Sequence, residues 1–136
     1  MNEQVERDVM EYDVLIIGGG PSGLSSAIKV KQLANAEGKD VSVCVLEKGS
    51  EIGAHILSGN VFEPTALNEL IPDWKEKEAP LNSPATKDIV KFMISENSSI
   101  NIPVPSFLIP TFNNHGNYVM SLANFTRWLA TQAESL

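Results

Sequence analysis

The sequence predicts an α/β protein, because an apolar strand, a glycine-rich turn, a helix and a second apolar strand follow one another near its start. The first strand covers residues 12–17 and the second covers residues 41–46. Between them lies a G-x-G-x-x-G turn, residues 18–23, which leads into the helix. This order is typical of a Rossmann-like β-α-β unit, which binds dinucleotides. The alternative is a glycine-rich turn in some other α/β fold.

Each glycine of the turn has its own expected role. Gly18 permits the tight turn, Gly20 lacks the Cβ that would block a pyrophosphate, and Gly23 lets the helix approach the strand. Pro21 and Ser22 lie between them at the start of the helix, whose free N–H groups attract an anion. We expect all five residues to border a cofactor site.

The segment after the turn supports the β-α-β interpretation. Ala27 and Ala34 are small residues that we expect on the helix face toward the sheet, and Gly38 is placed to end the helix. Glu47 directly follows the second strand. A carboxylate there accepts hydrogen bonds from the adenosine ribose and repels a 2′-phosphate, which disfavours NADP.

The loop after Glu47 is rich in glycine and small polar residues. Lys48, His55, Ser58 and Gly59 lie in it and are candidates to surround the cofactor, although an ordinary surface connection has the same composition. His55 fits a polar flavin contact, a proton carrier or a structural histidine. No spacing predicts a metal site, and no catalytic side chain is assigned.

The remaining segments predict a short helix over 64–70, a β-hairpin of residues 89–94 and 100–104, and a final helix over 124–136 with Ser121 as N-cap. The lone cysteine, Cys44, is expected to be buried and inert. The apolar face expected for the final helix comprises Leu122, Phe125, Trp128, Leu129, Ala133 and Leu136.

An uncharged, proline-rich stretch covers residues 102–112 and is too short to span a bilayer. It either covers the protein's own core or presents its large apolar side chains to a lipid surface or hydrophobic tail. Those side chains are Phe107, Leu108, Ile109 and Phe112.

Length and charge set further limits. The formal charge of −7 argues against a nucleic-acid partner, and one cysteine cannot build a disulfide or an iron–sulfur site. Residues 1–11 form a short acidic tail without the features of a targeting peptide. We expect residues 12–136 to be the N-terminal part of a truncated nucleotide-binding domain, with residues 88–118 as an inserted hairpin and apolar loop.

Several motifs resemble those of the electron-transfer flavoprotein:ubiquinone oxidoreductase family. Beyond the glycine turn, the resemblance rests on LS at 24–25, KQLA at 31–34, IGAH at 52–55, LSG at 57–59, PDWKEK at 72–77, APLN at 79–82, IPVP at 102–105 and NNHGNY at 113–118. It covers nearly the whole chain from Asp13 onward.

The resemblance implies a glutathione-reductase-type FAD domain in an electron-transferring-flavoprotein dehydrogenase. Such an enzyme takes electrons from reduced electron-transfer flavoprotein and passes them through FAD and a 4Fe-4S cluster to ubiquinone. It is monotopic on the inner membrane, on the cytoplasmic face in bacteria or the matrix face in mitochondria. The resemblance assigns the glycine turn and Glu47 to FAD, and favours a quinone or membrane contact for Phe107, Leu108, Ile109 and Phe112.

The resemblance also places the cluster ligands in sequence that this chain lacks, so the chain alone is expected to be inactive. Two other functions remain open. One is an FAD- or nucleotide-binding module without turnover, and the other is a different FAD- or NAD-linked dehydrogenase.

Overall fold

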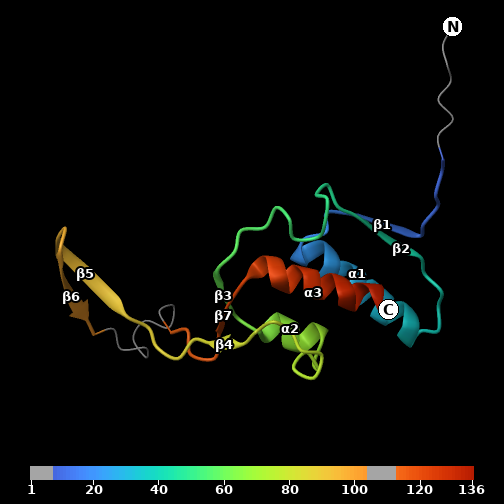
Figure 1. Ribbon diagram of the computed structural model, residues 1–136. Coiled ribbons are helices and arrows are strands. Elements are labelled where there is room, and N and C mark those ends of the chain that lie inside the picture. The colour runs from blue at the N-terminus through green and yellow to red at the C-terminus, as the bar shows by residue number, and fades with distance from the viewer. Residues whose placement is uncertain (1–7, 104–112) are drawn as a thin grey trace, which may run out of the picture.

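A computed structural model describes residues 8–103 and 113–136 of the chain. Strand β1 (Val14–Ile17), helix α1 (Pro21–Ala36) and strand β2 (Val43–Leu46) follow one another along the chain and form a β-α-β unit in which the two strands are parallel. The register pairs Val14 with Val43 and Ile17 with Leu46. The predicted Rossmann-like unit is therefore present (Figure 1).

Helix α1 ends as its sequence predicts. Gly38 adopts the left-handed conformation with φ +65°, its N–H donates to the carbonyl of Asn35 at 3.2 Å, and Lys39 N–H donates to the carbonyl of Ala34 at 2.9 Å. These two bonds are those of a Schellman motif, which satisfies the last helical carbonyls. The chain then turns back toward β2.

The sheet of β1 and β2 has one covered face. Helix α1 packs against both strands, whereas the other face leaves Leu15, Ile17 and Leu46 exposed by 56, 75 and 50 %. Cys44 lies opposite Leu15 on that same open face and is only half-buried. The expectation of a buried thiol was wrong, because side chains alternate between the faces of a strand and Cys44 points to the open one.

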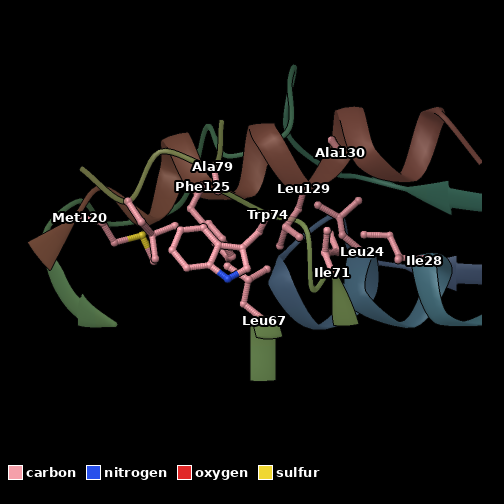
Figure 2. Close-up of a cluster of buried hydrophobic side chains, with 11 residues drawn as sticks. Leu24, Ile28, Leu67, Ile71, Trp74, Ala79, Met120, Phe125, Leu129 and Ala130 are labelled. Atoms are coloured by element: carbon pink, nitrogen blue, oxygen red, sulfur yellow. The ribbon is translucent and has the colours of Figure 1, made fainter. Parts of the chain in front are cut away.

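The main core lies between the helices. Helix α3 (Leu122–Glu134) packs along α1, and α2 (Thr65–Leu70) also contacts α1 (Figure 1). Figure 2 shows Trp74 among the apolar side chains of this core, and its indole N–H donates to Asn68 Oδ1 at 2.7 Å. The core residues are Leu24, Ile28, Leu67, Ile71, Trp74, Ala79, Leu81, Met120, Phe125, Leu129 and Ala130.

The expected face of the final helix was correct in part. Ser121 is the N-cap and accepts from Asn124 N–H at 3.4 Å, and Phe125 and Leu129 are buried. Leu136, however, lies beyond the last helical residue and is exposed. Thr126, which was not expected on this face, is fully buried, and its hydroxyl donates to the carbonyl of Leu122 at 2.7 Å.

A small antiparallel sheet that the sequence did not reveal joins distant parts of the chain. Its strand order is β3 (Asn60–Phe62), β7 (Tyr118–Met120), β4 (Ser83–Pro84). Asn60 pairs with Met120, and Ser83 pairs with Val119 on the other side of β7. The sheet places the segment after β2 next to the start of α3.

The predicted hairpin is confirmed, with strands β5 (Val90–Ser95) and β6 (Ser98–Ile102) antiparallel. It projects away from the helices (Figure 1). The quinone or membrane contacts predicted at Phe107, Leu108, Ile109 and Phe112 lie outside the described residues. Within residues 8–103 and 113–136, no helix has both the length and the apolar character needed to cross a membrane.

Candidate nucleotide-binding site

The glycine turn is fixed between the end of β1 and the start of α1. Gly18 has φ +107°, a conformation that side chains rarely adopt, and its N–H donates to the carbonyl of Leu46 at 2.7 Å. This bond ties the turn to the last residue of β2. The turn therefore lies at the carboxyl end of both parallel strands, where open α/β sheets bind ligands.

Gly23 and Gly20 have different surroundings. A Cβ on Gly23 would overlap the carbonyl oxygen of Gly18, so the helix can approach the strand this closely only without a side chain. A Cβ on Gly20 would meet no described atom within 4 Å. The backbone conformation there, φ −78° and ψ 178°, is also one that any residue can adopt. The space in front of Gly20 is open.

The first turn of α1 presents backbone donors to that open space. Gly20 is the N-cap and supplies no side-chain cap, and Pro21 occupies the first helical position. The first regular helical bond runs from Leu24 N–H to the carbonyl of Gly20 at 3.0 Å. The amides of Ser22 and Gly23, which precede it, have no partner within the helix and can receive an anion.

Glu47 closes the other side of the turn. Its Oε2 accepts from Gly19 N–H at 2.8 Å, and its Oε1 accepts from Gly49 N–H at 2.8 Å. These two hydrogen bonds lower the pKa of Glu47 below its ordinary value, and the bond from Gly49 has the larger effect. Nearby His55 lowers this pKa by a smaller amount. Each carboxylate oxygen keeps a further lone pair with which it can accept from a hydroxyl.

The four other loop candidates lie at different places. Lys48 and His55 are exposed, and His55 Nδ1 lies 3.2 Å from the position of a Cβ on Gly49, beside Glu47. Ser58 instead donates its hydroxyl to Ser121 Oγ at 3.2 Å, toward α3. Gly59 adopts φ +87° and starts the path into β3. The structure thus brings His55 to Glu47 and directs Ser58 elsewhere.

Sequence reasoning missed Arg127. This side chain lies on α3 and pairs with Glu51 of the loop after β2, with Nη2 and Oε1 3.0 Å apart. The two residues are 76 positions apart, and a single arginine in an amphipathic helix predicts no partner. No cluster of three or more potential metal ligands was found among the described residues.

The fold and this geometry are those of a Rossmann-like β-α-β unit. In agreement, the family described as NAD(P)-binding Rossmann-like domain matches residues 16–72. The chain is also 58 % identical, over 97 % of its length, to the electron transfer flavoprotein-ubiquinone oxidoreductase of Pseudomonas aeruginosa. The resemblance to this group of oxidoreductases is confirmed.

Relatives from distant organisms carry the same name. The mitochondrial electron transfer flavoprotein-ubiquinone oxidoreductase of Dictyostelium discoideum is 55 % identical over 96 % of the chain. The human mitochondrial protein is 48 % identical over 97 % of the chain. The chain spans only 24 %, 21 % and 21 % of the length of these three relatives.

Proposed function

We propose that this chain binds FAD as the Rossmann-like part of an electron transfer flavoprotein-ubiquinone oxidoreductase. The observation that carries the proposal is the open space in front of Gly20 at the N-terminus of α1, where the amides of Ser22 and Gly23 have no partner within the helix. Helix N-terminal amides favour a diphosphate, and the absence of a Cβ at Gly20 leaves room for it. These residues therefore fit the pyrophosphate of a dinucleotide cofactor.

Glu47 supports an adenosine end at the neighbouring position. Its carboxylate is held at the turn by Gly19 and Gly49, so it is charged and oriented near neutral pH. The ribose hydroxyls would donate to it. On this proposal the FAD lies as in a glutathione-reductase-type domain, and Pro21, Lys48 and His55 border it near the turn and Glu47. Ser58 and Gly59, which are directed toward α3 and β3, would meet it only farther from the turn.

The bound FAD would supply the electron-transfer chemistry, and the residues of this chain would bind and orient it. The names of the relatives support reduced electron transfer flavoprotein as the donor and ubiquinone as the acceptor. We further propose action at the surface of the inner membrane, with Phe107, Leu108, Ile109 and Phe112 as contacts. A 4Fe-4S cluster would take its ligands from outside this sequence, which has one cysteine.

The experiment that tests this function uses the protein as its gene encodes it. Purified with its flavin, it should reduce a soluble ubiquinone analogue when supplied with reduced electron transfer flavoprotein. A control reaction replaces that donor with NADH and should give no reduction. Flavin binding without any quinone reduction would instead support the second candidate, a nucleotide-binding module without turnover.

That second candidate is favoured by the glycine turn alone, which can bind a nucleotide whether or not turnover follows. A third candidate, an NAD-linked dehydrogenase, is distinguished by titration. On the proposed function, FAD changes the tryptophan fluorescence of flavin-free protein at micromolar concentration, whereas NADH at the same concentration does not. The reverse order of affinity would contradict the FAD assignment.

A further inference from the structure

We infer that the loop of residues 49–59, here called the brace loop, ties α3 to the glycine turn and thereby positions Glu47. On this inference Arg127 and Gly53, which lie outside the nucleotide-binding motif, are positioning residues that set the affinity for FAD. The inference rests on the proposed FAD site and adds to it a dependence on a helix more than seventy residues further along the chain.

The brace loop makes polar contacts with the first two turns of α3. Glu51 Oε1 of the loop lies 3.0 Å from Arg127 Nη2 of α3. The Arg127 side chain is also held within α3, because its Nη1 donates to Asn124 Oδ1 at 3.2 Å. At the other end of the loop, Ser58 donates to Ser121 Oγ, the N-cap of the same helix. Two separate points of the loop are therefore bound to one helix end.

Between these points the two backbones touch. Gly53 is buried with φ +85°, and a Cβ built on it would lie 2.9 Å from the carbonyl oxygen of Ala123 and 3.5 Å from Arg127 Cγ. An L-residue is strained at this φ, and its side chain would push the loop off the helix. Gly53 thus permits the close approach of the brace loop to α3.

The other side of the brace loop reaches the glycine turn. Ile52, the neighbour of Gly53, extends its Cδ1 into the space that a Cβ on Gly19 would take, and it also packs against the main core. Gly49 N–H and Gly19 N–H hold the two oxygens of Glu47. A shift of the loop at Gly53 therefore moves Ile52 and Gly49 and, through them, the carboxylate of Glu47.

The expected effects differ in size. Both side chains of the Glu51–Arg127 pair are substantially exposed, so reversing one charge should weaken FAD binding only about fivefold. Gly53→Ala combines backbone strain with a steric contact and should weaken binding by about tenfold or more. The matched control is Lys77→Glu, which reverses one charge of the similarly exposed Lys77–Asp73 pair and should leave FAD binding unchanged.

The test measures FAD dissociation constants by flavin fluorescence for the protein as its gene encodes it. The variants are Arg127→Glu, Glu51→Arg, the exchanged pair Glu51→Arg with Arg127→Glu, and Gly53→Ala. The exchanged pair should recover binding to within about twofold of wild type, because the attraction is restored with opposite orientation. If Gly53→Ala does not fold, the charge exchange still decides.

A second series repeats Arg127→Glu and Gly53→Ala in a Glu47→Gln background. There each should change affinity by less than about twofold, since both act through the carboxylate that is now absent. Undiminished effects of Arg127→Glu and Gly53→Ala in the Glu47→Gln background would overturn the inference. Failure of the exchanged pair to recover binding would also overturn it and would indicate that Arg127 contacts the cofactor directly. Wild-type affinity in both Arg127→Glu and Gly53→Ala would also overturn it while leaving the proposed function intact. Wild-type protein that binds no FAD would overturn both.

Discussion

The carbonyl oxygen of Gly18 occupies the place that a Cβ atom on Gly23 would take. Gly20, three residues before Gly23 in the same motif, faces open space instead. Gly23 is therefore required by the packing of α1 against the turn after β1, whereas a glycine at position 20 is required only by the pyrophosphate of the proposed FAD. This difference allows the fold and the ligand site to be tested separately.

Gly23→Ala should destabilise the protein. The added methyl group must displace the backbone at Gly18, and overpacking of this kind costs about 1–3 kcal/mol. Urea unfolding measures the free-energy difference from wild type. Gly20→Ala is the control and should change the free energy of unfolding by less than about 0.5 kcal/mol. Equal stability of Gly23→Ala and wild type would contradict the close packing.

Leu129→Ala should remove a central contact of the helical core. Leu129 is 1 % exposed on α3, and truncation of such a buried leucine costs about 2–5 kcal/mol. Leu33→Ala on α1, where the leucine is 53 % exposed, serves as the matched control and should cost far less. Thermal and urea unfolding of both variants would show the difference, and similar losses would argue against the observed packing of α3 on α1.

Ser42 and Asp13 fasten the starts of β1 and β2 together. Asp13 Oδ2 accepts from Ser42 N–H at 2.8 Å and from Ser42 Oγ at 2.7 Å, while Asp13 N–H donates to the same hydroxyl oxygen at 2.9 Å. These hydrogen bonds lower the pKa of Asp13 from 3.8. The bond from the Ser42 hydroxyl has the largest effect, and the bond from Ser42 N–H has the next largest. The ionised Asp13 carboxylate therefore stabilises the folded protein. This contribution is fully present above pH 3.8 and is lost as the pH falls through the lowered pKa of Asp13.

Ser42→Ala should raise the pKa of Asp13 toward 3.8 and lower stability near neutral pH. The acid-induced loss of stability should also become smaller, because less stabilisation remains to be lost. Carbon-detected NMR titration of the Asp13 carboxyl group measures the pKa, and urea unfolding above and below that pKa measures the stability. An unchanged Asp13 pKa in the variant would refute the role of the hydroxyl.

Glu47→Gln should weaken FAD binding about tenfold near neutral pH, because a neutral amide accepts hydrogen bonds from ribose hydroxyls less strongly than a carboxylate. The pKa of Glu47 is lowered from 4.5, so wild-type affinity should be constant from about pH 5 to about pH 8 with respect to this group. Affinity should fall only as the pH drops through the lowered pKa. Equal affinity of wild type and variant would remove Glu47 from the site.

The sequence predicted the elements whose signals are local. The glycine turn, the Gly38 helix end and the Ser121 cap each depend on residues within a few positions, and all three have the expected geometry. The hairpin was also predicted, although β6 begins at Ser98 rather than near residue 100. Local backbone requirements are strong enough to be recognised in one sequence.

Contacts between distant residues could not be predicted in the same way. The sheet of β3, β7 and β4 uses strands of two or three residues, too short to show an alternating pattern. The Arg127–Glu51 pair joins exposed side chains that carry no positional signal. Thr126 was not expected in the core because it is polar, but its hydroxyl is satisfied within its own helix.

The FAD assignment rests on the open space in front of Gly20, and titration of flavin-free Gly20→Val with FAD tests it. The variant should still fold, since nothing described lies within 4 Å of the new Cβ. Its affinity for FAD should nevertheless fall by about a hundredfold or more, because the side chain would fill the space assigned to the pyrophosphate. A stable Gly20→Val protein that binds FAD as tightly as wild type would contradict the assignment.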